Sequence, residues 1–452
     1  MTGQKRLALI IAILASFVAF LDGSVINVAL PAITESLSGG LATQQWIVDA
    51  YLITLGALML TAGSLSDIFG RKRILTWGLA GFAVTSVGCA LAPTNELLIV
   101  SRALQGVAGA LLVPSSLALI ISTFSGKAQG KAIGLWTAWT GIAFVIGPLV
   151  GGLLVDNSSW RFIFAINIIP IGLTLWLMSR LTHSDTFQRS SNVDVIGSLL
   201  AAVSLGGMVF ALIEQTNYGW LHPVICIPLI IGLFSLTAFV WYERRTSHPT
   251  LPLNLFSARN FSVGNIATVA IYAALSIATF LLAVFVQQIG GYSALEAGFA
   301  LLPVTILMFL LSGKFGAFAG THGPRLFMAI GPIVAGVGFV TMLGIDKTVN
   351  YWYLLPGILL FGTGLSITVA PLTSAILGAI DSRQAGIGSA VNNAVARIAG
   401  LIGIAFLGVV TGPSLTLDGF KRGIILIATL LFIGGIIAAL GIQNVKTKEK
   451  TP

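Results

Sequence analysis

Apolar residues fill most of this chain, and short polar breaks divide them into long stretches. A helix needs about 20 mostly apolar residues to cross a bilayer, whereas a membrane β-strand needs only about 10 alternating ones. Fourteen stretches meet the helical criterion between Leu7 and Ile442. They predict transmembrane helices over residues 7–33, 44–65, 74–92, 97–124, 131–155, 161–181, 193–214, 222–242, 260–288, 295–319, 325–345, 351–377, 386–410 and 421–442.

The composition agrees with a membrane protein. Hydrophobic residues make up 56% of the 452 positions and charged residues only 9%, against about 25% charged residues in soluble domains. The first stretch follows two basic residues as a signal peptide does, but it continues through Asp22 without a small-residue cleavage site. We therefore interpret it as the first span. Cys89 and Cys226 lie inside apolar runs, which argues against a disulfide framework or a metal site.

The positions of the basic residues predict the topology. With the N-terminus in the cytoplasm, all but six of the 24 Lys and Arg fall in cytoplasmic loops and tails, as the positive-inside rule requires. An even number of spans then places both termini in the cytoplasm. The net charge of +9 thus reflects the orientation of the chain in the cell membrane, and nucleic acid is not an expected partner. The six exceptions are Arg102, Arg161, Lys347, Arg397, Lys421 and Arg422.

Two long polar breaks and an internal repeat predict the domain organisation. The breaks run from His183 to Asp194 and from Glu243 to Asn260. The segment GSLSDIFGRKRI at 63–74 is echoed by GAFAGTHGPRLF at 316–327, a constant offset of 253 residues. Chance similarity between glycine-rich loops is the alternative. Two related six-helix halves are typical of transporters with a substrate site near the midplane. The predicted parts are a six-helix bundle over 1–190, two additional helices over 191–250 and a second six-helix bundle over 251–452.

Two acidic residues interrupt the apolar stretches of the first half. Asp22 follows an apolar run of the first span, and Asp49 lies in QQWIVDAYLITL of the second. A carboxylate is costly inside the membrane, so such a residue is a functional candidate. It could bind and release a proton as its exposure changes. The alternatives are an interfacial turn at Asp22 and a helix-end charge at Asp49.

An arginine on the fourth predicted span could pair with one of these acids. Arg102 and Gln105 are three residues apart and share a helix face. Gly106 and Gly109 beside them would allow another helix to approach closely. An intramembrane arginine pairs with an acid or with backbone carbonyl groups. Asp22 is the predicted partner, and a purely structural contact with carbonyl groups is the alternative.

Four motifs together resemble the fourteen-span drug:proton antiporters of the major facilitator superfamily. They are LDGSVINVALP at 21–31, GSLSDIFGRKRI at 63–74, SRALQGVAGALLVP at 101–114 and GIAFVIGPLVGG at 141–152. The resemblance extends over essentially the whole chain. It implies an all-α integral membrane protein with the major facilitator fold, in which two six-helix bundles and two extra helices make 14 spans. It also implies export by alternating access.

The resemblance assigns expected roles to motif residues. It implies proton coupling at Asp22 and Asp49. Arg102 is added to the coupling residues as the predicted partner of Asp22, because protonation of the acid would free the arginine. The resemblance implies a conformational latch in the loop 63–74, where the glycines permit a tight turn, although its basic residues could serve topology alone. It implies an antiporter helix over 141–152, where proline interrupts the backbone hydrogen bonds, with plain packing as the alternative. The latch residues are Gly63, Asp67, Gly70 and Arg71, and the antiporter-helix residues are Gly141, Gly147, Pro148, Gly151 and Gly152.

Five residues are tentative substrate contacts. Trp136 and Trp139 are three apart and could stack on a flat or cationic substrate, although lipid-facing tryptophan is the alternative. Asn393 and Arg397 are four apart on the thirteenth span and share a face. Gln105 beside Arg102 completes the set.

The sequence favours proton-coupled efflux of amphipathic small molecules, including cations, by a monomer in the lipid bilayer. The alternative on the same fold is export of an endogenous metabolite or lipid-like molecule. A membrane-embedded enzyme is the third hypothesis, but no Ser/His or His/Asp constellation lies within the predicted spans. No GxxxxGK[ST] motif occurs, so ATP coupling is not expected. We expect no cofactor and no metal, with the proton gradient as the energy source.

Overall fold

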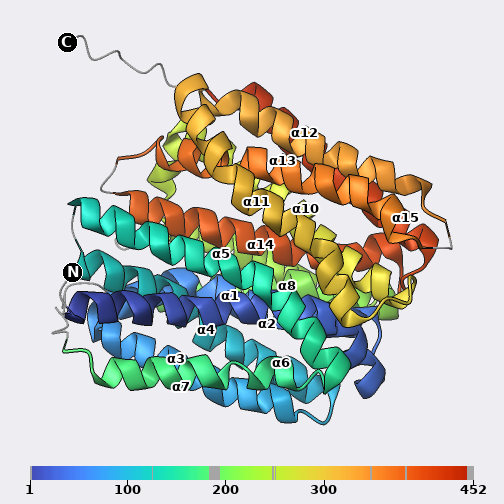
Figure 1. Ribbon diagram of the computed structural model, residues 1–452, viewed down its shortest axis with the longest axis horizontal. Coiled ribbons are helices and arrows are strands. Elements are labelled where there is room, and N and C mark those ends of the chain that lie inside the picture. The colour runs from blue at the N-terminus through green and yellow to red at the C-terminus, as the bar shows by residue number, and fades with distance from the viewer. Residues whose placement is uncertain are drawn as a thin grey trace. The chain divides into compact units, whose positions relative to one another are not determined.

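The computed structural model describes residues 3–124, 126–182, 194–246, 249, 251–346, 349–381 and 384–444. Helices dominate these residues, as Figure 1 shows. The helices are α1 (Gly3–Leu37), α2 (Leu41–Phe69), α3 (Arg71–Leu91), α4 (Asn95–Thr123), α5 (Gly126–Asn157), α6 (Phe162–Ala165), α7 (Ile168–Ser179), α8 (Val195–Tyr218), α9 (Pro223–Glu243), α10 (Arg259–Gln288), α11 (Ala294–His322), α12 (Pro324–Thr341), α13 (Tyr351–Leu377), α14 (Ala385–Thr411) and α15 (Leu417–Gly441), with short 3₁₀ turns η1 (Leu253–Ser257) and η2 (Met342–Gly344).

The predicted spans coincide with these helices. Within the described residues, 13 segments are long and apolar enough to cross a membrane. The predicted span 44–65 lies in α2, a further continuous helix of 29 residues. The predicted span 161–181 is divided into α6 and α7 by a short turn around Asn167. The predicted all-α membrane fold is confirmed.

The chain separates into two compact units. The first contains residues 1–252, 279–299 and 404–419, and the second contains residues 253–278, 300–403 and 420–452. The predicted bundle boundaries at residues 190 and 250 lie outside the described residues and stay predictions.

In the first unit, α1 packs against α4, α5 and α7, while α2 and α3 both pack against α4. Their apolar side chains form a continuous core that includes Ile11, Leu55, Phe82, Leu112 and Ile171. Since lipid offers no partner for backbone polar groups, helices satisfy them internally. The remaining polar side chains of this core must then find partners among one another.

The helix pair α8 and α9 also belongs to the first unit. The two helices pack against each other, and α8 packs against α2. Near one end of α2, the indole N–H of Trp46 donates a 2.8 Å hydrogen bond to Glu214 Oε1. Near the other end, the hydroxyl groups of Thr61 and Ser198 are hydrogen-bonded. The additional pair is thus attached to α2 along much of its length.

In the second unit, α12 and α13 pack closely along their lengths (Figure 1). Glycines make this approach possible, because a Cβ atom at Gly338 would lie 2.6 Å from the carbonyl oxygen of Gly357. The polar side chains of this unit include Asn392 on α14, whose Nδ2 donates to Asn265 Oδ1 at 3.1 Å and Thr268 Oγ1 at 3.0 Å.

The internal repeat has a counterpart in backbone geometry. Gly70 ends α2 with φ 92°, and Gly323, 253 residues later, separates α11 from α12 with φ 86°. Residues with a Cβ atom rarely adopt such positive φ values. Both copies of the repeat therefore use a glycine to make the same tight junction between two long helices, which supports the predicted repeat.

Candidate functional site

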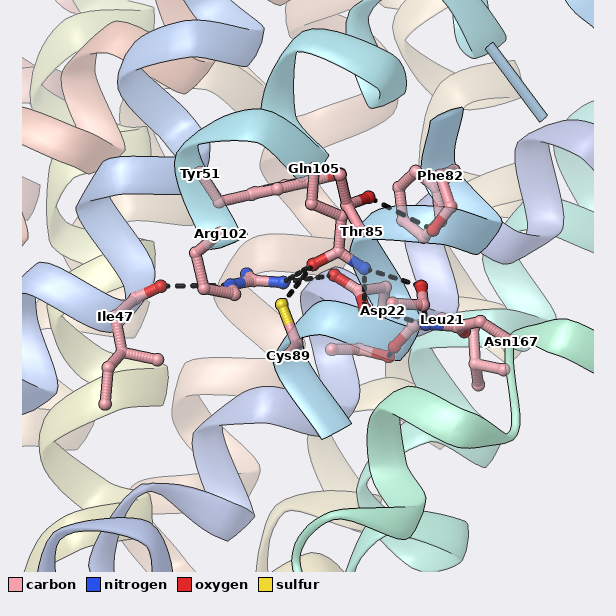
Figure 2. Close-up of polar contacts among 12 residues, drawn as sticks. Leu21, Asp22, Ile47, Tyr51, Phe82, Thr85, Cys89, Arg102, Gln105 and Asn167 are labelled. Atoms are coloured by element: carbon pink, nitrogen blue, oxygen red, sulfur yellow. Dashed lines mark hydrogen bonds and ion pairs between the residues drawn. The ribbon is translucent and has the colours of Figure 1, made fainter. Parts of the chain in front are cut away.

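Asp22 lies in the middle of α1 and is fully buried. The helix continues through this residue to Leu37, so the alternative of an interfacial turn at Asp22 is wrong. A carboxylate enclosed in a helix bundle needs several hydrogen-bond donors to remain ionised. The surrounding helices supply them (Figure 2).

Three side chains donate to the Asp22 carboxylate, two from α4 and one from the turn between α6 and α7. Arg102 Nη1 lies 2.6 Å from Oδ2 and forms a buried ion pair. Gln105 Nε2 donates to Oδ1 at 3.0 Å, and Asn167 Nδ2 donates to the same oxygen at 2.9 Å. The predicted pairing of Asp22 with Arg102 is confirmed. Gln105, a candidate substrate contact, is also part of this network, and its substrate role stays a prediction.

Arg102 is held on several sides at once. Its Nε donates to the carbonyl oxygen of Ile47 at 3.1 Å, and its Nη1 also donates to Gln105 Oε1 at 2.8 Å. The guanidinium lies over the ring of Tyr51, 4.4 Å from the ring centroid. Both predicted partner types, an acid and a backbone carbonyl, therefore bind Arg102 together.

Sequence reasoning missed three members of the network. Ser86 Oγ accepts from Gln105 Nε2 at 3.0 Å and from Asn167 Nδ2 at 3.4 Å. The thiol of Cys89 donates weakly to Gln105 Oε1 at 3.6 Å. Asn167 had a usable signal, because it is an isolated amide in the apolar run FIFAINIIP. Ser86 and Cys89 had none, since small polar residues are frequent in membrane helices.

Asp49 has a very different environment on α2. Its side chain is fully buried, and neither carboxylate oxygen has a hydrogen-bond partner among the described residues. The alternative of an exposed helix-end charge is therefore wrong. The structure does not place Asp49 in the network of Asp22, although both are on helices that pack against α4.

The predicted latch loop lies at the junction of α2 and α3. Gly63 and Asp67 belong to the last turns of α2, but the surroundings of Gly63 and the side chain of Asp67 are outside the described part of the structure. The tight turn expected of Gly70 is confirmed by its positive φ. Arg71 is half-buried at the start of α3, and Lys72 Nζ donates to the carbonyl oxygen of Leu181 at 2.7 Å. The latch role stays a prediction.

The glycines of the antiporter motif differ in their surroundings. A Cβ atom at Gly147 would collide with Ser24, and one at Gly151 would collide with Val25. Ser24 Oγ also donates to the carbonyl oxygen of Ala143 at 3.1 Å. These contacts hold α5 directly against α1 beside Asp22.

The other motif residues lie away from α1. Gly141 is exposed, and a Cβ atom added to it would have no neighbour within 4 Å among the described residues. Gly152 lies against the backbone of Ala294 and Leu295 at the start of α11, and the carbonyl oxygen of Pro148 lies against Gly298. α5 continues past Pro148 to Asn157. The motif thus provides close packing on two sides of one helix.

The candidate substrate residues belong to both units, and their surroundings differ. Trp136 donates to Ser16 Oγ at 3.0 Å and packs in a buried cluster, whereas Trp139 is 49% exposed. On α14, Asn393 is exposed and bonds to Ser389 of its own helix, while Arg397 is half-buried. The described residues thus give Trp136 a structural partner and leave the substrate roles as predictions.

A polar cavity of about 410 Å³ lies in the first unit where α1, α5 and α10 end. Its lining includes Glu35, Asp156, Gln287 and Tyr292. Asp156, at the end of α5, accepts hydrogen bonds from the backbone N–H groups of Ala294 at 3.1 Å and Leu295 at 2.9 Å. The carboxylate therefore caps the first turn of α11.

Comparison with known proteins adds independent information. The family description "Major Facilitator Superfamily" matches residues 12–404. The chain is 34% identical to a methylenomycin A resistance protein of Bacillus subtilis (strain 168), covering 90% of this chain and 88% of the relative. It is 31% identical to the puromycin resistance protein pur8 of Streptomyces alboniger, covering 92% and 86%.

Solved structures agree on the fold. A crystal structure of a peptide transporter POT in complex with sulfate superimposes with a TM-score of 0.72 at 16% identity, covering 95% of this chain and 93% of that chain. The xylose transporter XylE from E. coli gives 0.66 at 13% identity, with both chains fully covered. At these identities the likeness concerns the fold alone.

Proposed function

Because this chain belongs to the major facilitator superfamily, we propose that it exports amphipathic small molecules, lipophilic cations among them, in exchange for protons. It is a multi-pass membrane transporter of small molecules, and its relatives include resistance proteins for methylenomycin A and puromycin. The direction of transport, the proton coupling and the substrate class are the parts that we propose.

The observation that carries the proposal is the buried charge in the first unit. Asp22, Asp49 and Arg102 are each at most 1% exposed, although burying charge in a membrane bundle is costly. Packing alone does not require these groups, because apolar side chains of similar volume replace buried ion pairs with little or no loss of stability. Their presence supports a coupling role, in which protonation changes the balance of charge.

The arrangement of Asp22 suggests how coupling would work. Its carboxylate connects α1, α4 and the α6–α7 junction through Arg102, Gln105 and Asn167. A proton on Asp22 would remove the charge that holds these donors and would loosen three segments at once. Protonation and substrate binding would then favour different conformations, which is the requirement for exchange.

Close packing of α5 supports the same mechanism. Gly147 brings α5 against Ser24 of α1, and Gly151 brings it against Val25. A movement of α1 after a change at Asp22 would therefore be transmitted directly to α5, and through Gly152 to the start of α11.

The test uses the purified protein in liposomes that contain an internal pH dye. A proton gradient is imposed, and a panel of lipophilic cations, neutral drugs and lysolipids is added. We expect proton flux that depends on one substrate class and is lost when Asp22 or Asp49 is replaced by Asn. Flux that persists in both variants would contradict the assignment of coupling to these residues. Transport without proton movement would overturn proton exchange, and flux with lysolipids alone would indicate export of lipid-like molecules.

A further inference from the structure

We infer that Asp49 holds a proton in this conformation, and that the contact of Gln45 with α14 seals this proton from the membrane side where α2 begins. The inference deepens the proposed function and rests on it for its role in transport. In this conformation the proton is on Asp49, while Asp22 is ionised and bound to its donors.

The environment of Asp49 does not support an ionised carboxylate. Both oxygens are buried, and no described residue donates to either of them. An unpaired charge at such a position costs several kcal/mol even after relaxation, so the group neutralises instead. Asp22 has the opposite environment, with a guanidinium and two amides bound to its oxygens.

Four charged or titratable groups on the helices that pack against α2 have partners other than Asp49. Arg102 of α4 binds Asp22 of α1 and the Ile47 carbonyl. Glu214 of α8 accepts from Trp46 and Asn217, and Cys89 of α3 contacts Gln105. Tyr51, two residues after Asp49, has its ring under the guanidinium of Arg102. Residues 404–411 of α14 contain no titratable side chain. Among the described residues, Asp49 is thus left without a counter-ion, and the proton supplies its neutrality.

Gln45 lies between Asp49 and the beginning of α2. The two residues are four apart, so they share a helix face. Gln45 is 1% exposed, and its Nε2 donates to the carbonyl oxygen of Ile404 and, at 3.3 Å, to that of Ala405. Gly408 lies directly against the same amide, since a Cβ atom added at Gly408 would be 3.0 Å from Gln45 Oε1.

This contact has the properties of a seal that can open. Water that approaches from the start of α2 reaches Gln45 before it reaches Asp49. The seal consists of one side chain bound to two carbonyl oxygens, so its opening sacrifices few hydrogen bonds. By the predicted topology this side is the outside, where a proton enters during exchange. When α2 and α14 separate, Asp49 gains water and can exchange its proton.

The proton on Asp49 can be observed without any substrate. Infrared spectra of the purified protein in lipid at neutral pH report the C=O stretching band of a protonated carboxylic acid. We expect this band in the wild type, its loss in Asp49→Asn and a displaced band in Asp49→Glu. Controls at the other buried carboxylates are Glu243→Gln and the charge-neutral pair Asp22→Asn with Arg102→Met, and both should keep the band. A wild type without the band, or a band that survives in Asp49→Asn, would overturn the inference.

The seal is tested by the rate at which the same band shifts after transfer into D₂O. Gln45→Ala should accelerate the shift on the order of 3- to 10-fold, as the loss of one or two hydrogen bonds implies. Gln44→Ala is the matched control, because Gln44 is equally buried but donates to Thr34 of α1 at 3.0 Å. Equal rates in the two variants would contradict the seal. A normal band together with absent proton flux in liposomes would overturn the proposed function alone.

Discussion

Nη1 of Arg102 lies 2.6 Å from Oδ2 of Asp22, although the residues are 80 positions apart and belong to different helices. Both side chains are almost completely removed from solvent. In such surroundings neither charge is stable without the other, and the bonds from Gln105 and Asn167 complete the carboxylate's shell. The pair therefore determines how α1 and α4 face each other at this depth.

Replacing one member of this ion pair should destabilise the protein more than replacing both members. Asp22→Asn and Arg102→Met are each expected to lower the free energy of unfolding by ~3–5 kcal/mol, because each leaves an uncompensated group. The double variant should recover at least half of this loss. The measurement is a double-mutant cycle by unfolding in mixed detergent micelles. Single variants that are as stable as the wild type would show that the pair contributes nothing.

Asn167 should behave as a positioning residue for Asp22. Asn167→Leu removes the 2.9 Å bond to Oδ1 and the contact with Ser86, with an expected loss of ~1–3 kcal/mol. Asn157→Leu is the matched control, since Asn157 is exposed and its one bond within the described part of the chain is to Leu153 of its own helix. Thermal unfolding of both variants gives the comparison. The assignment fails if the two substitutions have equal effects.

The antiporter motif contains its own control pair. Gly147→Ala should force α5 away from Ser24 and lower stability by ~1–3 kcal/mol, with reduced transport. Gly141→Ala meets open space and should leave both unchanged. Adding Ser24→Ala to Gly147→Ala should restore part of the loss, because it removes the hydroxyl that the new methyl group meets. Transport assays and unfolding curves of these variants test this packing, and no difference between the two single glycine variants would refute it.

Asp156 should stabilise the contact between the end of α5 and the start of α11. Asp156→Ala removes both hydrogen bonds to the first turn of α11, and loss of such a cap costs ~0.5–2 kcal/mol. Opening of this contact is measured by the rate at which maleimide labels Ala297→Cys, because Ala297 is buried. The labelling uses a Cys226→Ser background, since the other native cysteine, Cys89, is buried. We expect labelling to accelerate several-fold. Unchanged labelling would show that the cap does not hold this contact.

The sequence predicted the parts of the structure that depend on local pattern. Long apolar stretches indicated the spans, because the bilayer sets their length. The positive φ of Gly70 followed from the glycine-rich repeat. The pairing of Asp22 with Arg102 followed from the free-energy cost of an unpaired charge in the membrane, because a partner of opposite charge reduces this cost.

The remaining contacts depend on distances that the sequence does not contain. Asn167 reaches Asp22 because a short turn separates α6 from α7 at that level, and no periodicity signals such a break. Trp136 is a hydrogen-bond donor to Ser16 because of the rotation of α5 relative to α1. On α14, the sequence favoured Asn393, but the adjacent Asn392 makes the part-buried contacts with Asn265 and Thr268 of α10. One residue corresponds to a rotation of about 100°, which apolar periodicity does not resolve in helices surrounded by lipid and protein.

The attachment of α8 and α9 to α2 has an evolutionary consequence. The pair is bound through Trp46 with Glu214 and through Thr61 with Ser198, all within the first unit. Because both contacts attach the pair to one helix, α8 and α9 can move together with α2 during a conformational change. The pair can therefore vary in sequence during evolution without altering the bonds that Asp22 forms with Arg102, Gln105 and Asn167.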